Sequence, residues 1–143
     1  MQDILKYENR DRLYDFLVTD FGMVKVEEKF DEENFGNFLI ILSSDDFLLR
    51  YVNNRSHLTI DIASKLEPAK GFDLSFVRDL IYTPGSINND ERELDDTTRI
   101  SELNNFLRTD FDRISNLFSV QNYQDTRRKI DEGLKRQFDK RFR

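Results

Sequence analysis

The chain has 143 residues, of which 38% are apolar and 35% are charged, and its formal net charge is −6. This length and composition are typical of one globular domain with a heavily charged surface. The absence of cysteine excludes disulfides, thiol nucleophiles and thiolate metal sites. No basic segment followed by an apolar stretch begins the chain, and no apolar run approaches the length of a membrane span, so we expect an intracellular, cytoplasmic protein.

Residues 1–22 are expected to form a helix. Apolar side chains recur at helical spacing within residues 3–21. Gly22 follows them at the position where a left-handed residue would end the helix.

Residues 23–64 predict a four-stranded antiparallel meander. The expected strands are separated by short polar turns, and they are Met23–Phe30, Phe38–Leu42, Phe47–Val52 and Leu58–Ile62. With Asn54 and Arg55 at the tip of the last hairpin, the pairs in the two later hairpins are Tyr51–Leu58, Leu49–Ile60, Phe47–Ile62, Leu42–Phe47, Ile40–Leu49 and Phe38–Tyr51. The first hairpin adds Val26–Phe38 and Val24–Ile40. This pairing predicts one apolar face across all four strands.

The reverse face of this sheet is mixed. Charged residues lie at its flanks, and its apolar middle consists of Leu39, Ile41, Leu48 and Val52. Such a face is either partly covered by a helix or used for binding, and a homodimer is one of the options.

Residues 72–142 predict three more helices, after a connecting loop at residues 65–71. Asp73 is a good N-cap for a helix at residues 74–82. The next helix is expected to start near Thr98 or Ser101 and to run to about Phe118, and the last to start near Asn122. Residues 85–97 predict an exposed acidic loop. The chain as a whole, residues 1–143, is therefore expected to be a single α+β domain, a four-stranded antiparallel meander sheet packed with one N-terminal helix and about three C-terminal helices.

Charge is distributed unevenly. Residues 127–143 contain eight basic and three acidic side chains, a net +5, so the remainder carries −11. An acidic body would repel nucleic acid and suits a basic protein partner. The alternative is a nucleic-acid accessory protein that binds through the basic C-terminal helix.

Two short acidic segments are candidate partner-binding sites. They consist of Asp31, Glu32 and Glu33 in one turn and Asp45 and Asp46 in the next. Paired carboxylates bind metals or share protons, but they are also ordinary turn formers. No calcium-loop pattern is present, and we expect neither a metal nor a cofactor.

A polar group on the reverse face of the last hairpin is the remaining candidate. Arg50 is expected to face Thr59, with Asp61 diagonal to it and His57 near the hairpin end. These side chains could act as an acid–base pair, contact a partner or an anion, or form a charge-paired surface. The chain has one histidine, no Gly-x-Ser-x-Gly and no glycine-rich phosphate loop, so a small enzyme using Arg50, His57 and Asp61 is only a third hypothesis.

Residues 36–82 carry a resemblance. The turn Ser43-Ser44-Asp45-Asp46, the run FLLRYVNNRSHLTIDIAS and the run FDLSFVRDLI follow one another. This pattern, with Arg50, Asn54-Arg55, Asp61 and Asp73-Leu74, resembles small uncharacterised bacterial proteins, some of which are immunity proteins of toxin systems. The resemblance implies a non-enzymatic interaction module, an antidote to a basic toxin for example.

Overall fold

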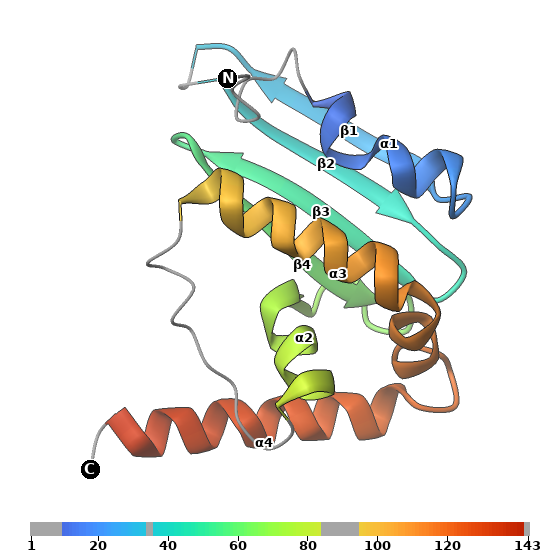
Figure 1. Cartoon of the computed structure of the whole chain (residues 1–143), viewed down its shortest axis with the longest axis vertical. Helices are drawn as coiled ribbons and strands as arrows, with labels where there is room; N and C mark the ends of the chain where they lie inside the picture. Colours follow the sequence, from blue (N-terminus) through green and yellow to red (C-terminus); the bar gives the residue numbers. More distant parts are fainter. Residues whose placement is uncertain (1–9, 34–35, 84–94, 142–143) are drawn as a thin grey trace.

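A computed structural model describes residues 10–33, 36–83 and 95–141 of the chain. Within these residues, five strands form one antiparallel sheet in the order β1-β2-β3-β4-β5 (Figure 1). The strands are β1 (Val24–Asp31), β2 (Asn37–Ser43), β3 (Phe47–Asn54), β4 (His57–Ser64) and β5 (Gly71–Asp73). The helices are α1 (Asp11–Thr19), α2 (Leu74–Tyr82), α3 (Asp96–Leu117) and α4 (Tyr123–Arg141). The predicted α+β class with an antiparallel sheet is confirmed.

The helices form a layer on one side of the sheet. Figure 1 shows α1 and α3 crossing in front of the strands, with α2 and α4 beyond the β5 edge. Along β2, β3 and β4, almost fully buried side chains on the helix side alternate with half-buried side chains on the other side. We call the helix side the core face and the other side the reverse face.

The predicted faces of β2, β3 and β4 are confirmed, but the predicted pairs are wrong by two residues. Tyr51 lies opposite Ile60, and Leu49 lies opposite Ile62. The hairpin tip is at Arg55 and Ser56 rather than at Asn54 and Arg55. Moving a tip by one residue changes each pairing by two, which leaves the alternation of side chains between the faces intact.

The tip itself has an unusual backbone. Arg55 and Ser56 both have positive φ, 53° and 64°. A two-residue hairpin turn requires this conformation to match the twist of its strands, and it is usually occupied by Asn-Gly. The backbone N–H of Arg55 donates to Oδ1 of Asn37 at 2.7 Å, which fixes the turn against the start of β2.

The strand predicted at residues 23–30 is present as β1, but its predicted facing and pairing are wrong. Val24 and Val26 are 61% and 57% exposed instead of facing the core. A bulge between Lys25 and Glu27 inserts an extra residue, so Glu28 pairs with Ile40 on the core face. The alternation of apolar and polar residues does not reveal a bulge, because the side chains before it and after it each alternate between the two faces of the sheet.

A fifth strand was not predicted. Residues 65–73 were expected to be a loop followed by the start of a helix, but Gly71–Asp73 pairs with β4 and places Phe72 opposite Ile62. Three residues are too few to show a strand period. The Asp73 carboxylate accepts a hydrogen bond from the backbone N–H of Ser75 at 2.9 Å, so the predicted cap of α2 is confirmed.

The other helix limits differ in detail. The described part of α1 begins at Asp11, and the earlier residues of the predicted first helix lie outside the described residues. Gly22 has the predicted left-handed conformation, with φ of 70°. Helix α3 begins at Asp96, earlier than predicted, because Asp95 accepts a hydrogen bond from the backbone N–H of Thr98 at 2.7 Å.

A hydrogen-bonded chain crosses the core. Tyr51 on β3 is fully buried, and its hydroxyl donates to Oδ1 of Asn104 on α3 at 2.9 Å. The amide of Asn104 donates in turn to the carbonyl of Leu13 on α1 at 3.0 Å. Burial raises the pKa of Tyr51, so the hydroxyl keeps its proton and remains a donor.

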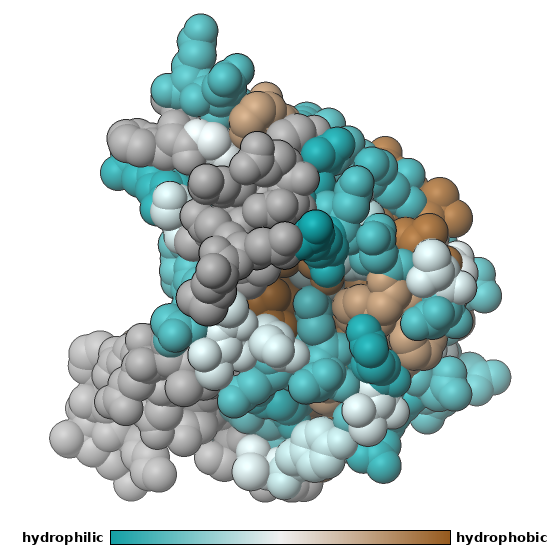
Figure 2. Space-filling view, turned by 45° about the horizontal axis from the view of Figure 1, so that its top comes forward, coloured by the Kyte–Doolittle hydropathy of each residue, from teal (hydrophilic) through white to brown (hydrophobic). Residues whose placement is uncertain are grey.

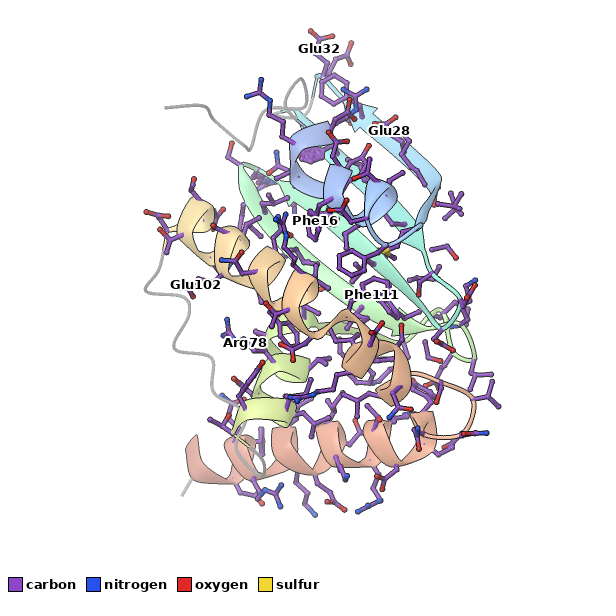
Figure 3. All side chains as sticks on the ribbon, turned by 45° about the vertical axis from the view of Figure 1, so that its right-hand side comes forward. Phe16, Glu28, Glu32, Arg78, Glu102 and Phe111 are labelled. Atoms are coloured by element: carbon purple, nitrogen blue, oxygen red, sulfur yellow. The ribbon has the colours of Figure 1, made fainter. Side chains whose placement is uncertain are left out.

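Aromatic packing surrounds this chain. Phe21, after α1, stacks on Phe111 of α3 with ring centres 4.4 Å apart, and Phe47 of β3 lies 5.4 Å from Phe111. Figure 3 shows Phe16 and Phe111 between the helices and the sheet. Burial of this apolar surface is the main source of stability, and the polar chain fixes the relative positions of the packed elements.

We predict an asymmetry between two substitutions in the chain. Tyr51→Phe removes one hydrogen bond and should cost about 1 kcal/mol of unfolding free energy, whereas Asn104→Ala leaves the buried Tyr51 hydroxyl without its acceptor and should cost about 2 kcal/mol. Urea unfolding measures both. The exposed neighbour Asn105→Ala is the control and should change stability little. An Asn104→Ala variant as stable as this control would contradict a structural role for the chain.

Candidate functional site

The structure separates the two predicted acidic segments. Asp31 ends β1 and Glu32 and Glu33 follow it at one end of the sheet, whereas Asp45 and Asp46 lie in the β2–β3 turn at the other end. Strand β2 runs between them, and its seven residues span about 23 Å at about 3.3 Å per residue. The two segments therefore do not form one contiguous binding surface.

The predicted polar group on the last hairpin is also divided. Arg50 lies directly opposite Asp61, a closer relation than the predicted diagonal, and Asp73 of β5 is the next residue across the sheet. The guanidinium extends over Gly71, where any side chain would collide with it. Within the described residues, the buried Nε of Arg50 has no hydrogen-bond partner.

The pKa of Asp61 is shifted by its surroundings. Partial burial raises its pKa, and the nearby charge of Asp73 raises it further, while Arg50 lowers it. The net effect is a pKa above the ordinary value of 3.8. The charge of Arg50 therefore only partly compensates the cost of ionising Asp61.

His57 belongs to a different group. It lies about 13 Å along β4 from Asp61 at about 3.3 Å per residue, and its Nδ1 is 3.3 Å from Oδ1 of Asp96. Asp96 also accepts hydrogen bonds from the backbone N–H of Leu58 at 3.0 Å and from Arg99 at 2.9 Å. Arg99 donates in addition to the carbonyl of Leu58. This clamp attaches the start of α3 to the start of β4, and Arg50, His57 and Asp61 do not assemble into an acid–base site.

The expected acidic loop at residues 85–97 is corrected at its end. Residues 84–94 lie outside the described residues, but Asp95 caps α3 and Asp96 forms its first turn. The sequence offered a clue to this role, because carboxylates just before an apolar periodic segment are typical of a helix start.

A second buried carboxylate was not identified from the sequence. Asp110 is buried within α3 at a kink where its backbone is not helical (φ −115°, ψ 19°). It accepts a hydrogen bond from the Tyr82 hydroxyl at 2.5 Å, which raises the pKa of Tyr82, and it lies 3.6 Å from Arg113. These bonds connect the end of α2 to the middle of α3.

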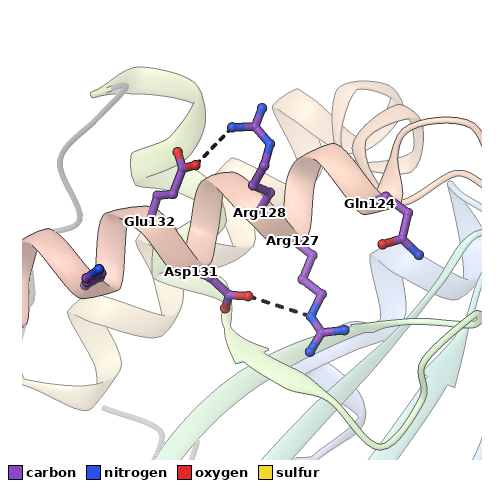
Figure 4. Close-up of a pocket in the computed structure, with 6 residues that line it drawn as sticks. Gln124, Arg127, Arg128, Asp131 and Glu132 are labelled. Carbon is purple, nitrogen blue, oxygen red and sulfur yellow. Dashed lines mark hydrogen bonds and ion pairs between the residues drawn. The ribbon is translucent and has the colours of Figure 1, made fainter.

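The basic helix α4 carries its own counter-ions. Arg128 is paired with Asp125 and Glu132, and Arg127 lies 2.8 Å from Glu67. The groove of about 390 Å³ in Figure 4 is lined by Gln124, Arg127, Arg128, Asp131, Glu132 and Lys135. Because both signs of charge alternate along it, this groove lacks the uniform positive field that a nucleic-acid backbone requires.

The acidic charge is concentrated at the opposite side of the molecule. Residues 10–33 contain eight acidic and four basic side chains, and α1 and β1 lie far from α4 in Figure 1. The carboxylate of Glu28 forms ion pairs with Arg10 and Lys25. Glu32 and Glu33 are exposed and have no ion pair with any described residue, and Figure 3 shows Glu32 projecting away from the body of the protein. We call residues 31–33 the acidic tip.

The ion pairs of Glu28 attach α1 to the edge strand. Partial burial would raise the pKa of Glu28, but hydrogen bonds from Arg10 and Lys25 outweigh it and hold that pKa below its ordinary value. Glu28 thus serves the fold, and the charge available to a partner lies on the acidic tip.

The reverse face carries a shallow pocket. Its volume is about 270 Å³, and it is lined by Lys29, Phe30, Asp31, Asn37, Phe38, Leu39, Val52, Asn53 and Asn54. Most of the described surface visible in Figure 2 is hydrophilic, with hydrophobic residues confined to smaller areas. Among the described residues, no group of three or more His, Asp or Glu side chains could hold a metal ion, and no helix has the length and hydropathy needed to cross a membrane.

We predict that Asp61→Asn stabilises the protein at neutral pH. Because the pKa of Asp61 is higher in the folded protein than in the unfolded chain, ionising Asp61 lowers the free energy of unfolding. The stability that goes with protonated Asp61 is fully present below pH 3.8 and is lost as the pH rises through the folded pKa. Urea unfolding of the variant and the wild type from pH 3.5 to pH 8 should give a stability difference that grows with pH.

The exposed Glu102→Gln on α3 is the control for this series. It should not reproduce the pH-dependent gain. A lower stability of Asp61→Asn at pH 7 would mean that the attraction to Arg50 exceeds the cost of burial.

Comparisons with known proteins identify no relative of this chain. No protein-family model, no curated protein and no solved structure matches this chain. The function must therefore be argued from the charges and surfaces of the protein itself.

Proposed function

We propose that the protein is a non-enzymatic, cytoplasmic protein-binding module that captures a basic partner protein, as an immunity-like inhibitor would. The observation that carries this proposal is the concentration of acidic charge in residues 10–33, with the exposed carboxylates of the acidic tip at its end. A protein partner rich in Lys and Arg is the binding partner with complementary charge.

The separation of charge favours fast and oriented association. Acidic residues outnumber basic ones in residues 10–33, around α1 and β1. Residues 119–143 contain eight basic and four acidic side chains. A basic partner is attracted to the first region and repelled by the second, which increases the fraction of encounters with the correct orientation.

The acidic tip also has an apolar neighbour. Phe30 precedes it on β1, is 42% exposed and lines the shallow pocket. Protein interfaces commonly place an aromatic anchor beside charged residues, because the anchor supplies affinity and the charges supply rate and specificity. Phe30 and the acidic tip together form the proposed binding region.

The two alternatives have less support. Binding of nucleic acid through α4 is opposed by the acidic partners of Arg127 and Arg128 on the same helix. An enzyme that uses Arg50, His57 and Asp61 is opposed by the separation of His57, whose Nδ1 lies 3.3 Å from Asp96.

The test is affinity capture by the tagged protein from a lysate of its source cells, at about 0.05 M and about 0.5 M NaCl. The wild type should retain a basic protein at low salt and lose it at high salt. The variant Asp31→Asn, Glu32→Gln, Glu33→Gln should retain much less, and with the purified partner its association rate should fall about tenfold.

A control variant separates local from global charge effects. Glu102→Gln, Asp112→Asn, Asp139→Asn removes the same number of charges from exposed positions on α3 and α4. It should behave like the wild type. Equal losses in the two variants, or capture that does not depend on salt, would overturn the proposed role of the acidic tip.

A further inference from the structure

The reverse face is not covered by any of the described helices. The residues that anchor α1 and α3 to the sheet, such as Tyr51 and Phe47, all lie on the core face. The apolar side chains of the reverse face extend over three neighbouring strands, and they are Val24, Val26, Leu39, Ile41, Leu48 and Val52. Two of these are more than half exposed, and the others are only half-buried. A contiguous apolar area of this kind on a soluble protein usually marks an interface.

The edges of the sheet do not offer an alternative route of association. The bulge at Val26 and the charged side chains of Lys25 and Lys29 interrupt β1, which is the usual protection of an edge strand. The other edge, β5, has three residues and leads at once into α2. Any association through the sheet must therefore use its face.

The charges of the reverse face select the occupant. Glu27 and Lys29 lie 3.1 Å apart, Arg50 lies beside Asp61 and Asp73, and Asp31 shares the alternation of Glu27 and Lys29, so the face carries two basic and four acidic side chains. A face that carries both signs of charge is suited to a second copy of itself, because a two-fold axis sets basic side chains of one copy against acidic side chains of the other.

The size of the face is adequate for a reversible dimer. Five strands at about 4.8 Å spacing and about seven residues at about 3.3 Å give roughly 550 Å² per copy, or roughly 1,100 Å² for two. A biological interface should bury at least about 1,000 Å². We propose that two copies of the chain pack reverse face to reverse face around a two-fold axis, as the sheets of a sandwich do, with Glu32 and Glu33 of each copy beyond the end of the packed strands.

The test is sedimentation equilibrium of the intact protein from about 1 µM to about 100 µM. The wild type should reach the mass of a dimer in this range. Ile41→Glu and Leu48→Glu place a charge on the reverse face and should give monomers. Val120→Glu adds the same charge at an exposed position between α3 and α4 and should leave the dimer intact.

Two further measurements keep the result interpretable if a glutamate variant unfolds. Ile41→Thr and Val52→Thr retain β-branched residues that strands accept, and each should raise the dimer dissociation constant about tenfold. High salt should preserve or strengthen an apolar dimer of acidic chains, whereas it should weaken capture of a basic partner.

The outcomes separate this inference from the proposed function. A wild type that stays monomeric at about 100 µM, or a dimer that persists in all four reverse-face variants, would overturn the dimer but leave capture by the acidic tip untouched. A dimer in a protein that captures no basic partner would support the interface and count against the proposed function.

Discussion

Three elements that are distant in the sequence are held in one arrangement by the hydrogen bonds from Tyr51 to Asn104 and from Asn104 to Leu13. Each bond is modest, but the Tyr51 hydroxyl is buried and Asn104 is half-buried, so these groups have few other partners available. The bonds fix α1 and α3 on the same side of β3. The two faces of the sheet therefore differ. The core face is packed under helices, and none of the described helices covers the reverse face.

The distribution of exposed carboxylates on the surface follows from this difference between the two faces. Carboxylates that lie beside the helical layer are used internally, as Glu28 is by Arg10 and Asp96 is by Arg99. Glu32 and Glu33, beyond the end of the sheet, are exposed and form no ion pair with any described residue. The proposed dimer face and the proposed capture region adjoin each other at the shallow pocket that Phe30 lines.

The sequence predicts the faces of the sheet better than its edges. Alternation identified Ile40, Leu49 and Ile60 as core residues, because burial imposes a period of two on each strand. The bulge in β1 and the three-residue β5 leave no periodic pattern, so they were missed. At the candidate site, alternation also placed Arg50 near Asp61. It could not reveal that His57 is bonded to Asp96, since that residue is 39 positions away and its position depends on the packing of α3.

The hairpin tip has a consequence for the order of folding. Arg55 and Ser56 occupy a backbone region that disfavours side chains. The β3–β4 hairpin accordingly has little tendency to close by local interactions alone. Hydrogen bonds between the backbone of Leu58 and the side chains of Asp96 and Arg99 join this hairpin to the start of α3. Contacts between segments so far apart in the sequence are of the kind that accompanies slower folding.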